Sequence, residues 1–433
     1  MPPASEAGLV RAIGARQLTA SIVNSTIGAG IFVLPAVAAA GLGAAAPIAY
    51  IFSAALMALI VCCVAAAGSR VSLTGGIYAY VEVAFGPYVG FLAGVLYFLT
   101  ATFAVVSVSS AFAGSIGALW PAADSPVARA MVIAALFTML AVVNIRGVRP
   151  GIRLVEGLTV AKLLPLLVLV GGGIWFVNPI DLRWPGMPAA SAIGQAAIVL
   201  IYAFAGLEIA LVPSGEVRDP ARTVPRALFS ALAITTLLYL LIQSVAQGLL
   251  GPAMASFSNA PLAEAASRVL GQGGRLLVLL GAVVSMFGYV AGDMLGSPRS
   301  LFAFARDGVL PKVVARIHPR FHTPYIAIAI YACIVAALAI SSSFRQLAVL
   351  ANVAALTGYL MCVAASYELQ RRDVRADGGI PFAVPGGPAI PILAAAVILW
   401  LLTSATRREF GVEALVLAVA TLFYFIRKTG GQL

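Results

Sequence analysis

The chain has 433 residues, of which 61% are hydrophobic and only 10% are charged, and its mean hydropathy is +1.02. A soluble domain carries roughly 25% charged residues, so this composition excludes a soluble protein and indicates the lipid bilayer as the solvent. The net charge of +11 does not indicate a nucleic-acid partner, because the basic residues gather in alternate loops, as they do in membrane proteins.

Uncharged stretches long enough to cross a bilayer recur along the chain. No charged residue lies between Arg16 and Arg70, and none lies in 83–123, 227–263 or 378–406. Because a helix needs about 20 apolar residues to span the hydrocarbon, the pattern predicts an all-α polytopic membrane protein with about twelve transmembrane helices. The expected spans are 17–39, 44–67, 86–117, 128–145, 154–177, 191–213, 227–250, 276–304, 324–341, 346–367, 388–405 and 411–426.

The positive charges predict how the chain sits in the membrane. With both termini in the cytoplasm, most of the 27 Lys and Arg residues fall in cytoplasmic segments, as the positive-inside rule requires. We therefore expect a multi-pass protein of the cell (plasma or inner) membrane with both termini in the cytoplasm. The sequence does not indicate the oligomeric state.

Glycine clusters predict a break in the first and sixth spans. The first span contains Gly28 and Gly30, and the sixth contains Gly206. Glycine weakens a helix, and unwound backbone is tolerated at membrane depth only where protein or water satisfies it. Such glycines also serve close helix packing. Their matched positions, five spans apart, favour a transporter binding site between two structural repeats.

Several motifs in chain order resemble those of the amino acid–polyamine–organocation permeases. Gly28-Ala29-Gly30-Ile31-Phe32 resembles the glycine motif of their first span, and 74–80 resembles their first cytoplasmic re-entrant loop. The segments 204–208 and 216–226 resemble their sixth span and the loop after it, and 299–311 resembles the end of their eighth span.

This resemblance implies a fold of the LeuT type, in which five spans are repeated with inverted topology and helices 1 and 6 are broken. The whole chain, 1–433, would form a single transporter domain that works by alternating access. The first repeat would cover 17–177, the second 191–367, and two peripheral spans 388–426.

The resemblance also implies how a zwitterionic amino acid is held. The backbone amides of the first break would bind its carboxylate, and freed carbonyl groups of both breaks would bind its ammonium. Many permeases carry a hydroxyl where this chain has Ala29, so backbone amides are expected to act here. Phe204 or Tyr202 would close over the substrate, with ordinary packing as the alternative for Phe204. The implied substrate-binding residues are Thr26, Ile27, Gly28, Ala29, Gly30, Tyr202, Phe204, Ala205, Glu208 and Asp293.

Three ionisable residues fall inside spans, where a charge is costly and indicates function. In sodium-independent permeases a lysine at the position of Lys162 replaces a sodium ion, and release of its proton would loosen the spans it ties; the alternative is that it snorkels to the membrane surface. Glu208 would pair with the substrate, carry the coupled proton or hydrogen-bond freed backbone amides, and the resemblance favours a structural or pH-sensing role over direct binding. Asp293 would neutralise Lys162, contact a cationic substrate or carry the coupled proton, and the sequence leaves these roles open.

We therefore predict a proton-coupled, sodium-independent secondary transporter of a neutral L-amino acid. The third span, at 100–105, lacks the amide of an arginine-exchanging permease, which favours a neutral substrate. A transporter of cationic amino acids or polyamines is the alternative, and a non-transporting receptor is another. We expect no enzyme, cofactor or metal: there is no phosphate-binding loop, and the two histidines, His318 and His322, lie in a proline-containing basic loop.

Overall fold

The computed structural model describes residues 13–71, 73, 76–146, 152–184, 186–207, 217–258, 260–306, 310–375 and 380–429. Within these ranges the regular structure is helical apart from a single bridge between Ile13 and Val217. The α-helices are α1 (Ala15–Thr26), α2 (Gly30–Leu42), α3 (Ala46–Gly68), α4 (Ile77–Phe85), α5 (Pro87–Leu119), α6 (Pro126–Arg146), α7 (Ile152–Gly173), α8 (Ala190–Phe204), α9 (Pro220–Leu250), α10 (Pro261–Arg306), α11 (Tyr325–Ser341), α12 (Phe344–Arg371), α13 (Ala389–Leu402) and α14 (Arg407–Thr429).

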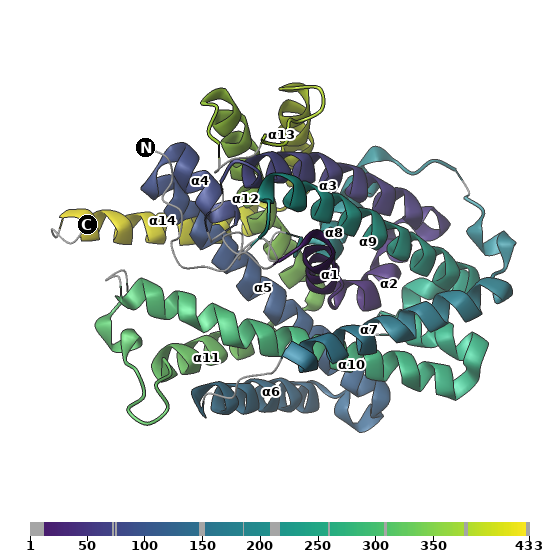
Figure 1. Ribbon diagram of the computed structural model, residues 1–433. Coiled ribbons are helices and arrows are strands. Elements are labelled where there is room, and N and C mark those ends of the chain that lie inside the picture. Colours follow the sequence, from purple (N-terminus) through teal and green to yellow (C-terminus); the bar gives the residue numbers. More distant parts are fainter. Residues whose placement is uncertain are drawn as a thin grey trace.

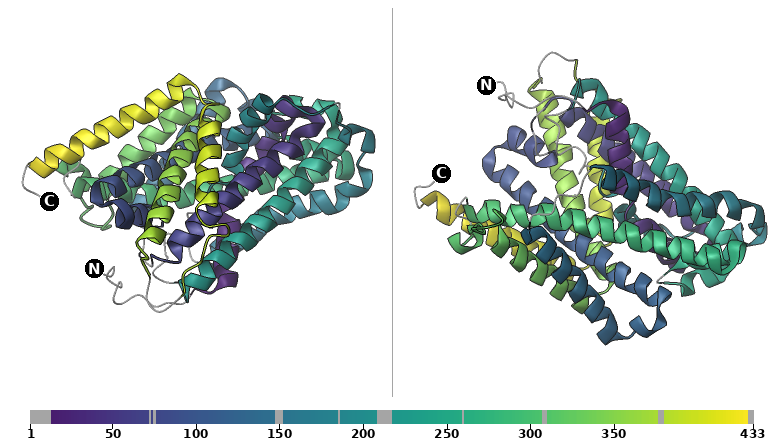
Figure 2. Two further views of the ribbon diagram at one scale, coloured as in Figure 1. Left: turned by 90° about the horizontal axis from the view of Figure 1, so that it is seen from above. Right: turned by 60° about the horizontal axis from the view of Figure 1, so that its bottom comes forward.

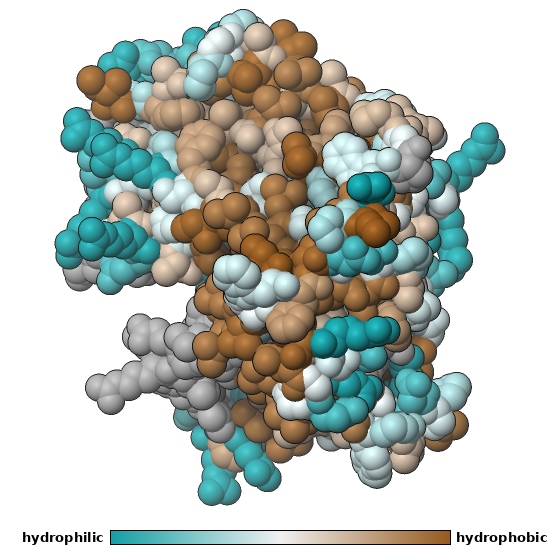
Figure 3. All heavy atoms as spheres, turned by 90° about the vertical axis from the view of Figure 1, so that its right-hand side faces the viewer, coloured by the Kyte–Doolittle hydropathy of each residue, from teal (hydrophilic) through white to brown (hydrophobic). Residues whose placement is uncertain are grey.

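The lengths and hydropathies of the helices confirm a polytopic membrane protein. Among the described residues, seven helical segments are long and apolar enough to cross a membrane, and four shorter apolar helices accompany them. Large apolar side chains are exposed along many of these helices. In the face shown in Figure 3, a broad hydrophobic surface occupies the middle, and hydrophilic residues gather toward its margins. Lipid is the natural solvent for such a surface.

Proline and glycine set several helix boundaries. Gly86 has φ +89°, which ends α4, and Pro87 then occupies the first turn of α5, where its missing N–H costs nothing. Pro220 begins α9 in the same way. Within α10, Gly271 has φ +60°, so this long segment is two helices that meet at a kink.

The two short helices α1 and α2 lie in the middle of the assembly (Figures 1 and 2). α1 packs against α9, α2 packs against α8, and α3 packs against both α8 and α9. A second group surrounds α5, which packs against α10 and α12, while α7 packs against α10. α14 lies at the periphery and extends to the C-terminus (Figure 2). The end of α1 and the start of α2 therefore lie in the core, between these two groups of helices.

Candidate functional site

The break between α1 and α2 lies next to the end of α8 in the core. α1 ends at Thr26 and α2 begins at Gly30, a break called here the first interruption, and α8 ends at Phe204, an end called here the second interruption. A hydrogen bond joins the two interruptions, because Ser25 Oγ donates to the carbonyl oxygen of Gly206 over 2.8 Å. Gly206 has φ +107°, and a β-carbon there would lie 2.8 Å from the carbonyl oxygen of Ser25. Both the backbone conformation and the close approach therefore require glycine.

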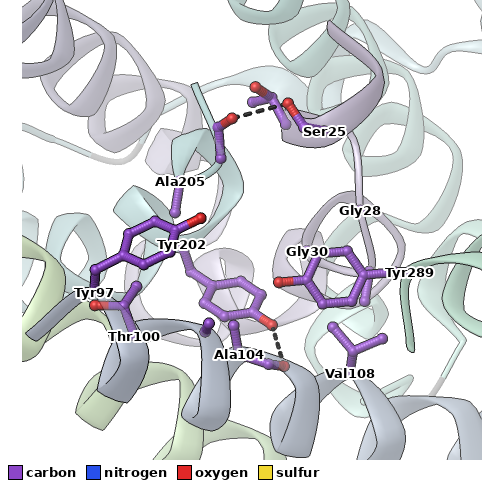
Figure 4. A pocket seen from close by; sticks show the side chains of 14 residues that line it. Ser25, Gly28, Gly30, Tyr97, Thr100, Ala104, Val108, Tyr202, Ala205 and Tyr289 are labelled. Atoms are coloured by element: carbon purple, nitrogen blue, oxygen red, sulfur yellow. Dashed lines mark hydrogen bonds between the residues drawn. The ribbon is translucent and has the colours of Figure 1, made fainter. Parts of the chain in front are cut away.

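A small cavity, called here the central cavity, lies between these interruptions (Figure 4). Its volume is about 40 Å³. Because a water molecule needs about 10–15 Å³ measured in this way, the cavity holds a few waters or one small solute. Its lining residues come from both interruptions and from α5 and α10: Ser25, Thr26, Gly28, Ala29, Gly30, Tyr97, Thr100, Ala101, Ala104, Val108, Tyr202, Ala205, Gly206 and Tyr289.

The first interruption presents hydrogen-bond donors to the central cavity. The N–H of Gly28 donates to the carbonyl oxygen of Thr26 over 2.9 Å, so this amide is already engaged. Ala29 and Gly30 stand at the start of α2, where amides have no partner inside the helix. The positive end of the helix dipole adds to their effect. This wall therefore favours a negatively charged group.

The second interruption presents hydrogen-bond acceptors. The N–H of Ala205 closes the last turn of α8 by donating to the carbonyl oxygen of Ile201 over 2.9 Å, and Ala205 itself has extended backbone with ψ 143°. Beyond that turn the last carbonyl groups of a helix have no partner within it. Tyr202 and Ala205 both line the cavity. The C-terminal end of a helix carries partial negative charge, so this wall favours a cationic group.

Tyr239 of α9 contacts the backbone of both interruptions. Its hydroxyl donates to the carbonyl oxygen of Ala203 over 2.7 Å and lies 3.3 Å from the carbonyl oxygen of Thr26. The side chain is fully buried, and the rings of Tyr50 and Phe204 pack edge-on against it, with centroids 6.3 and 5.3 Å away. Tyr239 and the hydrogen bond from Ser25 to Gly206 thus together fix the two interruptions relative to each other.

Tyr202 closes one side of the central cavity. Its hydroxyl is hydrogen-bonded to Ser107 Oγ and donates to the carbonyl oxygen of Ala104 over 3.1 Å, and both partners belong to α5 (Figure 4). Its ring packs edge-on against Phe344 of α12, with centroids 5.7 Å apart. These contacts join α8, α5 and α12 at this side of the cavity.

Tyr289 of α10 also lines the central cavity. Its ring lies beside the first interruption in Figure 4, and a β-carbon at Gly28 would lie 3.9 Å from it. Beyond Tyr289 lies a second cavity, called here the Asp293 cavity, of about 560 Å³. Five residues line both cavities and form the wall between them: Ser25, Gly28, Tyr97, Ala101 and Tyr289.

A third cavity of about 660 Å³, called here the Arg345 cavity, adjoins the side closed by Tyr202 and Phe344. The three cavities follow one another along α5. Tyr97 lines the Asp293 cavity, residues 100–108 contribute to the central cavity, and Ser110 lines the Arg345 cavity. The small cavity at the interruptions therefore lies between two larger ones.

Lys162 and Asp293 both line the Asp293 cavity but bind different partners. Lys162 is buried, and its Nζ donates to the carbonyl oxygen of Asn24 in α1. Asp293 accepts hydrogen bonds from Ser297 Oγ at 2.7 Å and from the hydroxyl of Tyr331 at 2.8 Å. Among the described residues no ion pair joins Lys162 to Asp293. The structure thus connects α7 to α1 through the lysine and α10 to α11 through the aspartate.

Comparison with known proteins identifies the family. The profile described as amino acid permease matches residues 13–411. The chain belongs to the amino acid permease family. It is 28% identical to the methylthioribose transporter of Bacillus subtilis (strain 168), over 96% of this chain and 93% of that protein. The serine/threonine exchanger SteT of the same organism is 27% identical over 92% of this chain and 91% of its own, and the branched-chain amino acid permease BcaP is 26% identical over 92% and 88%.

The structure of this permease places most of the residues singled out from the sequence around the two adjoining cavities. Ile27, Lys162 and Asp293 line the Asp293 cavity. Glu208 lies outside the described residues. The residues from the sequence prediction that line the central cavity are Thr26, Gly28, Ala29, Gly30, Tyr202 and Ala205.

Phe204 does not line the central cavity. It is fully buried and packs against Tyr239, so in this structure it takes the packing role that the sequence left as its alternative. Sequence reasoning missed Tyr97 and Tyr289, which do line the permease cavity. For Tyr289 a signal was present, because it precedes Asp293 by four residues and therefore shares its helix face.

Proposed function

We propose that this permease is a secondary active transporter of a small neutral L-amino acid, and that it works by alternating access. The observation that carries the proposal is the order of the three cavities along α5, with the smallest at the helix interruptions. A substrate held there is reached from one side past Tyr202 and from the other past Tyr289. Opening these sides in turn moves the substrate across the membrane.

The two interruptions complement the two charges of an amino acid. The amides of Ala29 and Gly30 would bind the carboxylate, with Gly28 contributing once its hydrogen bond to Thr26 opens. The carbonyl groups of Tyr202 and Ala205 would bind the ammonium, together with that of Thr26. Either charge buried without a partner costs several kcal/mol, so both walls are needed.

The side chains around the central cavity favour a neutral substrate. Its described lining residues carry hydroxyl groups or small apolar groups, and none of them is charged. Relatives named for serine and threonine, for branched-chain amino acids and for methylthioribose act on molecules without a charged side chain, which supports the same reading. A cationic amino acid or polyamine is less well matched, because Asp293 lies beyond Tyr289 in the adjoining cavity.

Lys162 supports transport that is coupled to protons and independent of sodium. Its ammonium group donates a hydrogen bond to the backbone of α1 two residues before the end of that helix. At this position the ammonium, with its positive charge, would take the place of a bound sodium ion. Release of its proton would remove that charge and loosen α7 from α1. The movement of α1 that opens the Asp293 cavity would thereby follow protonation.

The architecture that fits this mechanism has about twelve spans, the number that the uncharged stretches of the sequence predict. Each span would cross about 30 Å of hydrocarbon. In this arrangement α1 and α2 form one broken span, α8 begins another, and α4 remains at the membrane surface. The two repeats would cover 17–177 and 191–367, with 388–426 as peripheral spans. With both termini in the cytoplasm, the Asp293 cavity would open to the cytoplasm and the Arg345 cavity to the outside.

Uptake into proteoliposomes tests the proposal. Purified protein is reconstituted, and uptake of labelled L-serine, L-threonine, L-leucine, L-arginine and putrescine is measured with an imposed pH gradient, in sodium and in choline medium. We expect concentrative uptake of one neutral amino acid that depends on the pH gradient and is equal in the two media. Uptake of arginine or putrescine alone would show that the substrate is cationic and not neutral. Binding without flux would indicate a receptor.

A further inference from the structure

We propose that the Asp293 cavity is a second, transient binding site, where the carboxylate of Asp293 takes the ammonium group of the amino acid after it leaves the central cavity. The proposal rests on the transport function proposed above. It adds an ordered second step to the passage of the substrate and assigns Asp293 to that step, separate from binding at the helix interruptions.

Asp293 lies next to the wall that separates the two cavities. It follows Tyr289 by four residues on α10, so the two side chains lie one above the other on the same helix face. Tyr289 forms part of the wall that the two cavities share. A substrate that passes Tyr289 therefore meets Asp293 about one helical turn, or about 5.4 Å, further along α10.

The carboxylate of Asp293 has the chemistry to bind an ammonium group. Both of its described hydrogen-bond donors, Ser297 and Tyr331, are neutral hydroxyl groups. A carboxylate has about four acceptor positions, so acceptor capacity remains after these two bonds. A negative charge held inside a membrane protein is costly unless a cation compensates it. The ammonium of a passing substrate supplies that cation, and Lys162, the charged partner in the same cavity, is bonded to Asn24 instead.

The Asp293 cavity also has room for a ligand and a buried hydroxyl group without a hydrogen-bond partner among the described residues. Its volume of about 560 Å³ is far larger than that of the central cavity. Gly292 and Gly296 line it, and a β-carbon at either would meet nothing within 4 Å. Ser285 also lines it, is 6% exposed, and its Oγ has no hydrogen-bond partner among the described residues. A buried hydroxyl group of this kind is satisfied when a polar ligand or water enters.

The test separates equilibrium binding from release. In detergent, binding of labelled L-serine, L-threonine and L-leucine is measured by scintillation proximity, and the amino acid bound most tightly is then used for efflux from preloaded proteoliposomes. The variants are Asp293→Asn, which removes the charge, Tyr331→Phe, which removes one tie but keeps the charge, and Gly296→Val, which fills the cavity. Gly273→Val is the matched control, because Gly273 lies on α10, is exposed, and a β-carbon there meets nothing within 4 Å.

We expect Asp293→Asn and Gly296→Val to bind the amino acid within about twofold of the wild type but to release it about tenfold more slowly, since one charge-assisted hydrogen bond is lost or blocked. Gly273→Val is expected to behave as the wild type, and Tyr331→Phe is expected to keep most of its efflux. Gly292→Ala gives a milder filling of the same cavity if the valine variant does not fold, as judged by gel filtration.

Three results would overturn the proposal. Loss of equilibrium binding in Asp293→Asn alone would place Asp293 in the central site. If Tyr331→Phe slows efflux as much as Asp293→Asn does, the role of Asp293 is only structural, as a hydrogen-bond partner that joins α10 to α11. Thermal stabilisation of the wild type by sodium chloride over choline chloride, abolished in Asp293→Asn, would assign the site to a metal cation. If the wild type binds none of the three amino acids, the function proposed above fails instead.

Discussion

The hydroxyl of Tyr239 donates a 2.7 Å hydrogen bond to the carbonyl oxygen of Ala203 in the last turn of α8. The same hydroxyl lies 3.3 Å from the carbonyl oxygen of Thr26, at the end of α1. These two carbonyl groups flank the two interruptions, and Tyr239 is fully buried. Tyr239 therefore contributes, beside the bond from Ser25 to Gly206, to the spacing between the walls of the central cavity.

Replacing this residue by Tyr239→Phe keeps the ring and removes both contacts. We expect a loss of about 1 kcal/mol of stability, as for a buried hydrogen bond, and an increase of several-fold in the dissociation constant for the amino acid. Thermal melting and equilibrium binding in detergent measure the two effects. Tyr367→Phe is the control, because Tyr367 is 49% exposed on α12. Unchanged affinity in Tyr239→Phe would show that the spacing does not depend on this hydroxyl.

Lys162→Ala tests the coupling role of the lysine. The substitution removes the hydrogen bond to Asn24 and also removes the ammonium group, which is the group that we propose to release the coupled proton. We expect that a pH gradient no longer drives concentrative uptake, while exchange of internal for external substrate persists. Lys312→Ala is the matched control, since Lys312 is exposed in the short helix Lys312–Ala315. Pre-steady-state proton fluxes that are equal in Lys162→Ala and the wild type would contradict the coupling role.

Gly206→Ala tests the contact between the interruptions. An alanine β-carbon would lie 2.8 Å from the backbone oxygen of Ser25, and φ +107° is unfavourable for any residue except glycine. The backbone of the second interruption must therefore shift, and we expect at least a tenfold loss of affinity, since ligand groups tolerate little misplacement. Gly411→Ala serves as control, because a β-carbon there meets nothing within 4 Å. Wild-type affinity in Gly206→Ala would show that the interruption is pliable.

Arg70 attaches the segment after α12 to the end of α3. The residue is 8% exposed, and its Nη1 donates to the carbonyl oxygen of Val374 over 3.0 Å and lies 3.8 Å from Asp373 Oδ1. Hydrogen bonds from Arg375 hold the pKa of Asp373 below its usual value. The ion pair between Arg70 and Asp373 is therefore present at neutral pH and is lost as the pH falls through that lowered pKa, whereas the hydrogen bond to Val374 does not depend on it.

Arg70→Ala is expected to release this segment. The amide of Val374 donates to the carbonyl oxygen of Leu369 over 3.0 Å. We predict that this amide exchanges with solvent about tenfold faster, since opening of the segment no longer breaks the hydrogen bond from Arg70 to the Val374 carbonyl. Hydrogen–deuterium exchange with mass spectrometry measures the change. Arg316→Ala is the control, because Arg316 is exposed after the short helix that ends at Ala315. Protection at Val374 that matches the wild type would show that other contacts hold the segment.

The sequence predicted the all-helical membrane class and the backbone of the central cavity because both follow from local signals. Uncharged stretches mark membrane helices, and Gly28, Gly30 and Gly206 mark places where a helix is weak. The prediction that these glycines would gather at one site used their matched positions in the chain, and Ser25 and Gly206 are indeed in contact.

The aromatic walls could not be predicted with the same success. An apolar membrane helix has no polar face to indicate which side meets the cavity, so Tyr97 carried no distinguishing signal, and the signal at Tyr289 was its spacing from Asp293. Phe204 and Tyr202 are two residues apart and so point to different sides of α8, and only the packing of α9 shows that Tyr202 faces the cavity. The sequence left the role of Asp293 open, and the structure places it in the adjoining cavity, one helical turn beyond Tyr289.

The bond between Ser25 and Gly206, together with the contacts of Tyr239, has a mechanical consequence. Any rotation of α1 against α8 would stretch these bonds at the moment when the substrate also spans both helices. The segments around the two interruptions are therefore expected to move together as one rigid body. Their movement relative to the rest of the protein would then occur at the boundary with α5 and α10, where glycines and the Asp293 cavity leave room for it.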